Sequence, residues 1–285
     1  MEDKLLPEKN IVIFTNGNLF SRIILEKFLK KYQTQLFVVV IVTGDYFGNK
    51  GINAITKYLK STTLPFVLFK VWTLIIIKLL HIFNPNLIAN VKDLCKKFNV
   101  NYMETSNINQ NHLFDTIKNS NSEYLISVSC PQLIKAKWLE FFRGNGINIH
   151  SSLLPQYAGL APYFWVLSEG GIETGISVHY LTEGFDKGNI LSAKKIVIEN
   201  RTSSYMLFLK LCLLGQNNLI EGFEKMKNFE TGIYQDRSKK TYFSNPTIKA
   251  YQNLIKKGFC LFRITDLKFL YKTLKSFENK KYIRF

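Results

Sequence analysis

The chain contains 285 residues, of which 46% are hydrophobic and 21% are charged. This composition supplies enough apolar material for a buried core and excludes an intrinsically disordered protein. The formal net charge is +17, and residues 236–285 contain 13 Lys or Arg against 3 acidic residues. Such an excess indicates an anionic partner (a nucleic acid, a phosphorylated substrate or an anionic membrane surface) or else a solvated basic face without a partner.

Apolar runs and amphipathic segments alternate along the first half of the chain. Strands are expected over residues 11–15, 36–43, 100–103, 124–128 and 147–150. Helices are expected over residues 19–32, 90–98, 111–118 and 132–142. This alternation predicts an α/β fold with a Rossmann-like, doubly wound and mostly parallel sheet.

One segment, residues 65–83, is unusually apolar. Its length approaches that of a bilayer span, but Lys70 and Lys78 lie within it, and a charge near the centre of a span is costly. On a helical wheel these lysines fall on one side together with Thr73 and His81. The segment is therefore predicted to be a helix with a narrow polar stripe. It can serve as a buried core helix, as a lid or membrane-surface helix, or as a true span.

The pattern changes in the second half of the chain. We expect a helix over residues 163–167, strands over 175–181 and 190–198, and a long helix over 203–226 that begins with Ser203 or Ser204 as its N-cap. The basic segment that follows is predicted to be partly helical. The expected organisation is a main domain over residues 1–233, with an apolar insertion at about 44–90, and a small basic C-terminal appendage over 234–285.

Cysteine usage and the N-terminus favour a cytoplasmic protein. The four cysteines are widely scattered and follow no metal-binding spacing, so we expect reduced thiols and no metal site. Residues 1–10 are charged and polar, unlike a signal peptide. The glycine-rich patterns that bind dinucleotides or the phosphates of P-loop nucleotides are missing from the sequence, so neither type of site is expected.

Three polar residues of the second half can meet at one edge of the sheet. Asn148 and His150 are two apart on a predicted strand, so they share a face where open α/β sheets place ligands. Asp186 lies in a loop between Gly184 and Gly188. An amide and an imidazole can donate hydrogen bonds to an oxyanion, and a carboxylate can accept a proton. The set suits transfer of an acyl-type group to an amine, although a lone histidine is more often structural.

The window over residues 146–191 is similar to the folate-dependent formyltransferase family, which includes glycinamide ribonucleotide, methionyl-tRNA and sugar-nucleotide formyltransferases. The matching positions are Asn148, Ile149, His150, Ser152, Leu153, Leu154, Pro155, Tyr157, Gly159, Glu173, Thr174, Gly175, Val178, His179, Asp186 and Gly188. The resemblance implies the family's fold and transfer of a formyl group from 10-formyltetrahydrofolate as co-substrate. It also implies that Asn148, His150 and Asp186 are the catalytic residues.

The resemblance further implies where ligands bind. The pterin of the folate is expected between the loop before the Asn-x-His strand and the loop that carries Asp186. The cofactor-binding residues expected there are Cys130, Pro131, Gln132, Leu133, Ile134, Glu183, Gly184 and Phe185. Acceptor contacts are expected from Ser152, Leu154, Pro155, Tyr157 and Gly159. His179 is expected to support Asp186, and Cys130 is not expected to take part in the chemistry.

The acceptor amine is less sharply defined than the reaction. Ala158 stands where methionyl-tRNA and sugar enzymes commonly carry arginine. The apolar segment and the basic tail favour a phosphorylated small molecule, namely an amino sugar linked to a nucleotide or a lipid, together with peripheral membrane contact. Methionyl-tRNA, which would make tRNA a partner, and glycinamide ribonucleotide are alternatives. A formyltetrahydrofolate hydrolase and a non-catalytic folate-binding protein are alternatives of another class.

Overall fold

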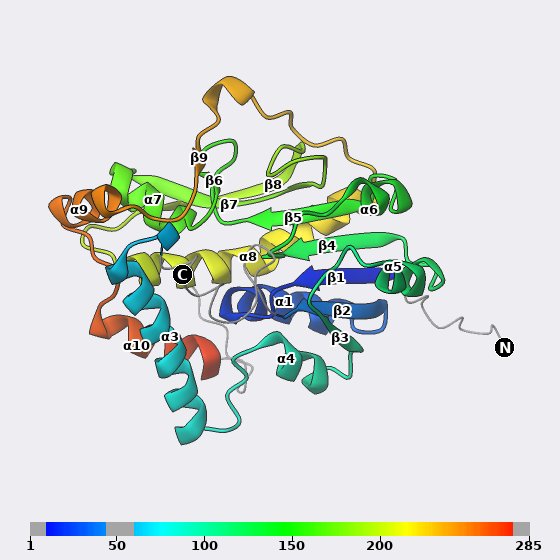
Figure 1. Ribbon diagram of the computed structural model, residues 1–285, viewed down its shortest axis with the longest axis horizontal. Helices are drawn as coiled ribbons and strands as arrows, with labels where there is room; N and C mark the ends of the chain where they lie inside the picture. The colour runs from blue at the N-terminus through cyan, green and yellow to red at the C-terminus, as the bar shows by residue number, and fades with distance from the viewer. Residues whose placement is uncertain (1–9, 44–59, 276–285) are drawn as a thin grey trace.

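The computed structural model describes residues 10–43 and 60–275, so residues 44–59 of the predicted insertion lie outside the described residues. A seven-stranded sheet forms the centre (Figure 1). Its strands in spatial order are β3 (Tyr102–Thr105), β2 (Leu36–Val42), β1 (Ile11–Thr15), β4 (Tyr124–Val128), β5 (Gly146–His150), β7 (Glu173–Tyr180) and β8 (Ile190–Val197). Neighbours from β3 to β5 are parallel, whereas β7 is antiparallel to β5 and to β8. The predicted doubly wound, mostly parallel sheet is confirmed.

Helices cover both faces of this sheet. The helices α1 (Leu19–Tyr32), α4 (Val91–Lys97) and α8 (Ser204–Lys227) cover one face, and α5 (Asn111–Lys118) and α6 (Ala136–Phe141) cover the other. The side chains of β1 supply both cores in turn, because successive residues of a strand point to opposite faces. Ile11 and Ile13 pack into the first core, whereas Val12 and Phe14 pack into the second.

Most of the predicted elements are confirmed to within two residues at each end. Ser203 is the N-cap of α8, since its hydroxyl accepts a hydrogen bond from the Met206 backbone N–H at 2.9 Å. The helix expected over 132–142 is wrong at its start, because α6 begins only at Ala136. The side chain of Gln132 forms hydrogen bonds with the backbone of residues 106 and 108. These bonds hold residue 132 in a loop ahead of α6.

The basic C-terminal segment packs onto the rest of the chain. The strands β6 (Ala158–Gly159) and β9 (Tyr242–Phe243) form a small parallel pair, and the 3-10 turn Arg237–Lys239 precedes β9. The helices α9 (Ile248–Lys256) and α10 (Ile264–Lys275) pack against α7 (Pro162–Glu169) and α8, respectively. Leu254 and Leu270 are fully buried in the first core. A domain boundary near residue 233 therefore stays a prediction.

The apolar segment forms α3 (Leu64–Phe83), which projects from the body of the molecule (Figure 1). Its buried residues are Phe66, Phe69 and Thr73. The interpretation of this segment as a buried core helix is therefore wrong. Within the described residues, α3 is the one helix long and apolar enough to cross a membrane, which is a matter of length and composition alone.

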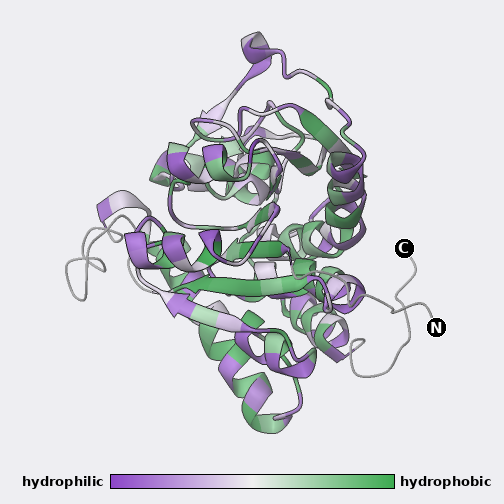
Figure 2. Cartoon of the chain, turned by 90° about the vertical axis from the view of Figure 1, so that its right-hand side faces the viewer, coloured by the Kyte–Doolittle hydropathy of each residue, from purple (hydrophilic) through white to green (hydrophobic). Residues whose placement is uncertain are grey.

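The polar stripe of α3 is divided: Lys70 and Thr73 face the protein, whereas Lys78 and His81 are exposed. Lys70 Nζ donates a hydrogen bond to the Tyr163 hydroxyl at 2.7 Å, and Thr73 is buried. His81 Nδ1 lies 3.1 Å from the Leu87 carbonyl oxygen. Eight large apolar side chains of α3 are exposed, and α3 accordingly reaches the bottom of Figure 2 as a largely green helix. A surface helix usually turns its apolar stripe inward, whereas α3 leaves many of its large apolar side chains exposed.

Two glycines of α8 set its distance from the sheet. A Cβ atom on Gly215 would lie 2.8 Å from the Ile176 side chain, and one on Gly222 would lie 2.4 Å from the Val178 side chain. Both contacted residues belong to β7. The close approach of α8 to this strand therefore depends on the missing side chains.

We predict that Gly222→Ala destabilises the protein although alanine is the better helix former. The gain in helix propensity is about 1 kcal/mol, whereas overpacking a stiff side chain costs about 1–3 kcal/mol. The free energy of unfolding, measured by urea denaturation, should fall by roughly 1 kcal/mol. Asn217→Ala, at an exposed position of the same helix, is the control and should be nearly neutral. A more stable Gly222→Ala variant would contradict this account of the packing.

Candidate active site

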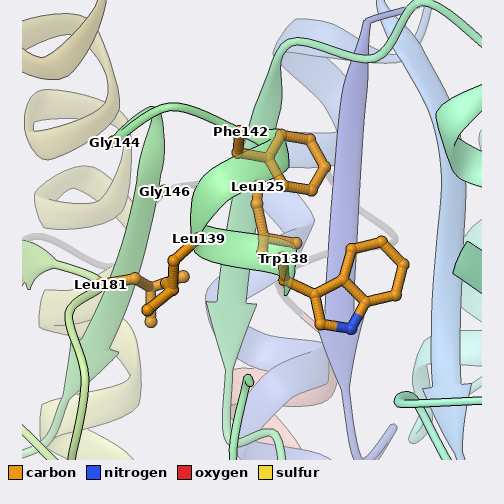
Figure 3. A pocket seen from close by; sticks show the side chains of 7 residues that line it. All are labelled: Leu125, Trp138, Leu139, Phe142, Gly144, Gly146 and Leu181. Atoms are coloured by element: carbon orange, nitrogen blue, oxygen red, sulfur yellow. The ribbon is translucent and has the colours of Figure 1, made fainter. Parts of the chain in front are cut away.

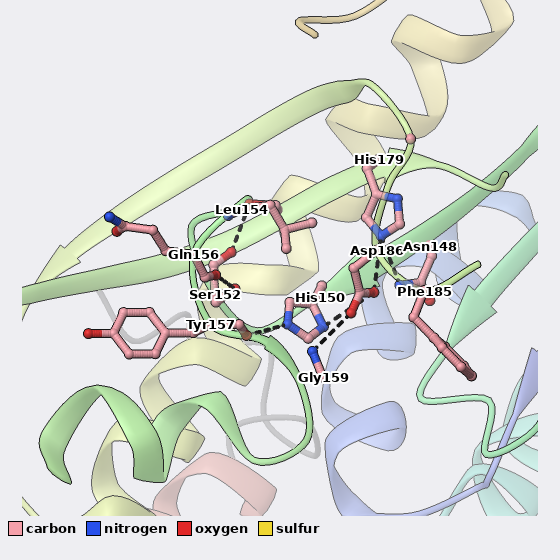
Figure 4. A network of polar contacts seen from close by, with 12 residues as sticks. Asn148, His150, Ser152, Leu154, Gln156, Tyr157, Gly159, His179, Phe185 and Asp186 are labelled. Atoms are coloured by element: carbon pink, nitrogen blue, oxygen red, sulfur yellow. Dashed lines mark hydrogen bonds and ion pairs between the residues drawn. The ribbon is translucent and has the colours of Figure 1, made fainter. Parts of the chain in front are cut away.

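Pairing between β5 and β7 brings an amide and two imidazoles together. Asn148 and His150 lie two apart on β5, and the register of the antiparallel pair places His179 of β7 opposite Asn148. The Asn148 Nδ2 atom lies 3.1 Å from His179 Nε2. His150 stands at the carboxyl end of its strand, the edge at which open α/β sheets bind their ligands. The predicted common face of Asn148 and His150 therefore carries a polar cluster (Figure 4).

The loop between β7 and β8 brings Asp186 to this cluster. Asp186 Oδ1 lies 3.7 Å from His150 Nδ1 and 3.5 Å from His179 Nε2, and Oδ2 accepts a hydrogen bond from the Gly159 N–H at 3.1 Å. Asp186 has a φ of 53°, in the left-handed region that aspartate tolerates better than most residues. A Cβ atom on Gly188 would lie 1.9 Å from the Tyr180 carbonyl oxygen. The glycine is thus required for the loop to turn back against β7.

The environment of Asp186 favours its ionised form. Burial of the carboxyl group opposes ionisation, but His150, a hydrogen bond from His179 and the Gly159 N–H together outweigh it. As a result the pKa of Asp186 lies well below its usual range. A carboxylate with such a pKa remains charged near neutral pH, where it can attract and orient positively charged groups.

Carbonyl oxygens fix the orientation of both imidazole rings. His150 Nε2 lies 2.9 Å from the Tyr157 carbonyl oxygen, so this nitrogen carries a proton and Nδ1 faces Asp186. His179 Nδ1 lies 2.8 Å from the Tyr180 carbonyl oxygen and is likewise the donor. When the His179 ring is neutral, its Nε2 accepts a hydrogen bond from the Asn148 amide. When the ring is protonated, the same nitrogen donates to Asp186. His179 can therefore orient either Asn148 or Asp186.

The loop predicted to bind the pterin is held largely by its own side chains. Gln132 accepts a hydrogen bond from Ile108 N–H at 2.8 Å and donates one to the Ser106 carbonyl at 2.7 Å. Ile134 is buried in the second core, whereas Leu133 is exposed. Burial raises the pKa of the Cys130 thiol to about 11, which does not suit a nucleophile at neutral pH. The role of this loop in cofactor binding stays a prediction. Its backbone and the exposed Leu133 side chain are the groups that would contact the pterin.

The other predicted cofactor residues lie around Asp186. Glu183, Gly184 and Phe185 belong to the same loop, and Figure 4 shows the Phe185 ring pointing away from His150 and Asp186. This ring is about half exposed, at 54%. An exposed aromatic ring next to a polar cluster offers a flat apolar surface to a ligand.

The loop predicted to contact the acceptor is also strongly braced. Ser152 Oγ donates to the Gln156 carbonyl at 2.7 Å, and the Ser177 hydroxyl accepts from Leu154 N–H at 3.1 Å. The peptide bond before Pro155 is cis. These contacts give Ser152 and Leu154 a structural role within the loop, and their contact with an acceptor stays a prediction.

Tyr157 and Gly159 are held by the C-terminal segment. The Tyr157 N–H donates to Thr241 Oγ1 at 2.8 Å, and the Tyr157 ring stacks on Phe243. Gly159 has a φ of 96°, and a Cβ atom there would lie 2.2 Å from the Phe243 carbonyl oxygen. Thr241 and Phe243 were not expected near the site, because the resemblance on which the site was predicted ends before them. Their sequence carries no motif that could have revealed the contact.

Two cavities among the described residues lie away from the polar cluster. A water-sized cavity of about 10 Å³ lies beneath α6, lined by Trp138, Leu139 and Gly146 among others (Figure 3). Gly146 begins β5 and His150 ends it, so this cavity is at the wrong end of the strand for a ligand of the cluster. A wider, open hollow of about 740 Å³ adjoins Glu183 and Lys187 on the outer side of the Asp186 loop. Within residues 10–43 and 60–275, no group of three or more His, Cys, Asp or Glu could hold a metal ion.

Sequence comparison relates the chain to enzymes of one-carbon transfer. The family model described as formyl transferase matches residues 9–221. The methionyl-tRNA formyltransferase of Caldicellulosiruptor saccharolyticus is 35% identical over 153 residues, which are 53% of this chain and 49% of that protein. The chain spans about half the length of the curated relatives it matches.

Two solved structures share the fold. The N-formyltransferase from Helicobacter canadensis, in complex with folinic acid and dTDP-3-aminofucose, has a TM-score of 0.55 at 16% identity, over 83% of this chain and 71% of that chain. The phosphoribosylglycinamide formyltransferase from Bacillus halodurans has a TM-score of 0.54 at 16% identity, over 76% of this chain and 95% of that chain. At such identities the likeness concerns the fold alone.

We predict that Asp186→Asn lowers the melting temperature at pH 7 and that the difference from the wild type closes in acid. The pKa of Asp186 in the folded protein lies below the unfolded value of about 3.9. Its ionised form therefore adds stability above that value, and the contribution is lost as the pH falls through the folded pKa. Asparagine tolerates the left-handed backbone equally well, so the change isolates the charge.

The measurement is thermal denaturation of both proteins between pH 7 and acid. Asp115→Asn, at an exposed position of α5, is the control and should leave the melting temperature close to that of the wild type. A difference for Asp186→Asn that does not change with pH would contradict the electrostatic interpretation.

Proposed function

Because this chain belongs to the formyl transferase family, we propose that it transfers a formyl group from 10-formyltetrahydrofolate to a primary amine. The convergence of Asn148, His150 and Asp186 at the ligand edge of the sheet carries the proposal. The amine nitrogen attacks the formyl carbon, and the carbonyl oxygen becomes an oxyanion. The bond from that carbon to N10 of the folate then breaks, N10 takes up a proton, and a formamide and tetrahydrofolate are released.

Each residue of the cluster has a part in this reaction. One N–H of the Asn148 amide points to His179, which leaves the second N–H to donate to the oxyanion. His150 lies beside the same carboxylate and supplies a second donor through Nδ1 when its ring is protonated, because its Nε2 N–H is directed at the Tyr157 carbonyl. Asp186 is ionised near neutral pH, so it can stabilise the positive charge that develops on the attacking amine and take up the proton that the amine loses, directly or through water.

We further propose that the acceptor is an amino sugar linked to a nucleotide or a lipid. The exposed apolar face of α3 and the basic residues 236–285 support an anionic, membrane-associated substrate. The likeness to methionyl-tRNA formyltransferases supports the second candidate, methionyl-tRNA. Glycinamide ribonucleotide is the third.

We predict that the chain releases tetrahydrofolate from 10-formyltetrahydrofolate only when an amine acceptor is present. The measurement is an acceptor screen with amino-sugar nucleotides, a lipid-linked amino sugar, methionyl-tRNA and glycinamide ribonucleotide, each followed by tetrahydrofolate release and mass spectrometry of the product. Release without any amine would instead indicate a hydrolase. If the protein binds folate but releases no tetrahydrofolate with any of the acceptors, it is a binding protein.

The matched variant for this screen is Asp186→Asn. Loss of the proton acceptor should lower turnover by about 10²- to 10⁴-fold, while folate affinity stays close to that of the wild type. Retained folate binding shows that the variant is folded at the assay temperature. Undiminished turnover would remove Asp186 from the mechanism.

We propose that the protein is a cytoplasmic enzyme that contacts an anionic membrane through α3. The exposed surface of α3, a helix about 30 Å long, is mostly apolar and also carries Lys78 and His81. The exposed apolar side chains are Leu64, Leu68, Val71, Leu74, Ile75, Leu79, Ile82 and Phe83. A row of this kind marks a site of interaction with another apolar surface.

Charge beside this face supports a membrane over another protein. The rings of Trp72 and Phe262 lie 3.7 Å apart, so the segment that leads into α10 packs against α3. Exposed basic side chains follow at Arg263, Lys268, Lys272 and Lys275. Asp266, the one acidic residue of α3 and α10, is buried and binds Ser203. Exposed apolar side chains on α3 together with exposed basic side chains on the neighbouring segment fit an anionic bilayer surface.

We predict that the purified protein co-sediments with vesicles of phosphatidylcholine and phosphatidylglycerol and binds less to phosphatidylcholine alone. Leu68→Ser with Ile75→Ser should weaken binding by more than about 100-fold, since each buried aliphatic side chain contributes roughly 1.5–3 kcal/mol. Ile172→Ser, an exposed apolar position outside α3, is the control. Failure of the wild type to bind either vesicle, or a stable dimer in solution that the double change dissolves, would overturn this proposal.

A further inference from the structure

A buried glutamine of the C-terminal segment holds the loop that carries Asp186. Gln235 is 4% exposed, and its Nε2 donates to the Gly188 carbonyl at 2.6 Å and lies 3.3 Å from the Asp186 carbonyl oxygen. Both acceptors belong to the backbone of the same short loop. One amide group thus ties together the two ends of the turn that presents the carboxylate.

The loop depends on such support because its backbone is constrained. Asp186 and Gly184 both have positive φ values, of 53° and 88°. Backbone carbonyls that lose a buried donor are costly, so the loop without Gln235 would move to reach water. Such a movement would change the distances from Asp186 to His150 and His179, which are 3.7 and 3.5 Å.

Other contacts place Gln235 firmly at this point. Ile233 and Ile190 exchange two backbone hydrogen bonds of 2.8 Å, which fixes the segment next to β8. Farther along, Lys240 Nζ donates to the Phe185 carbonyl at 3.1 Å, and the Thr241 and Phe243 carbonyls accept from Ala158 and Leu160 N–H. The segment over residues 233–243 therefore forms hydrogen bonds both with the Asp186 loop and with the backbone on either side of Gly159, whose N–H donates to Asp186.

We infer that Gln235 is a positioning residue for Asp186, outside the part of the chain, residues 9–221, that matches the family model. This inference rests on the proposed formyl transfer for its effect on rate. It assigns the C-terminal segment a role in the reaction, exerted through the aspartate loop.

The test compares Gln235→Met with Gln216→Met. Methionine has a similar length but no amide donor. Gln216 is a matched control, because it is also buried, at 3%, and its Nε2 donates to the Ile23 carbonyl at 2.9 Å in a distant part of the core. Both variants should lose stability in urea denaturation. In Gln235→Met alone, kcat should fall by about 100-fold for a displacement on the order of 1 Å, with the KM for folate little changed.

A second readout does not depend on turnover. The chain has four histidines, at positions 81, 112, 150 and 179, so their imidazole NMR signals can be assigned from single substitutions. At fixed pH, Gln235→Met should shift the signals of His150 and His179 and leave those of His81 and His112 in place. Gln216→Met should leave all four unchanged.

The outcomes separate the two proposals. A wild-type protein that transfers no formyl group to any acceptor defeats the proposed function, while the imidazole signals still test the positioning. Unchanged signals of His150 and His179 in Gln235→Met, with stability lost as in Gln216→Met, would show that Gln235 is merely structural and would overturn the inference.

Discussion

The charge of one nearly buried carboxylate governs how the candidate site is built. Taking a carboxylate out of water costs several kcal/mol unless hydrogen bonds and opposite charges replace the lost water. The Asp186 side chain is 11% exposed, and its partners come from three strands: His150 from β5, His179 from β7 and the Gly159 N–H from the short strand β6. These partners meet because β7 returns antiparallel beside β5. The two antiparallel strands at the sheet edge are therefore as necessary to the site as the parallel ones.

The local sequence was sufficient to predict what depends on periodicity and on short motifs. The helix over residues 19–32 and the strand over 124–128 follow from apolar spacing, and the common face of Asn148 and His150 follows from their separation by two on a strand. The start of α6 could not be predicted this way, because a long-range hydrogen bond of Gln132 competes with helix formation. The contacts of Gln235 and Thr241 were equally out of reach, since both residues are ordinary polar residues whose partners lie far away in the sequence.

The helix α3 shows a further limit of pattern alone. A helical wheel separates its polar stripe from its apolar face, and the usual expectation is that the apolar face is buried. Here Lys70 donates to the Tyr163 hydroxyl and Thr73 is buried, so the first half of the polar stripe faces the protein, whereas Lys78 and His81 are exposed together with much of the apolar face. Which side of a helix meets its neighbours is decided by the tertiary structure, in this case by the aromatic rings of Phe66 and Phe69 that lie on the inner side.

The contacts of residues 233–243 with the Asp186 loop and with the segment around Gly159 affect the order in which the protein folds during its synthesis. All seven strands of the sheet and the long helix α8 precede residue 228, so a growing chain can assemble its main layers before the segment with Gln235 and Phe243 has been made. At that stage the Asp186 loop lacks the amide that ties its ends, and Gly159 lacks the strand beside it. A nascent chain on the ribosome would therefore acquire a folded sheet first and an ordered site later, when the last part of the chain has emerged and docked.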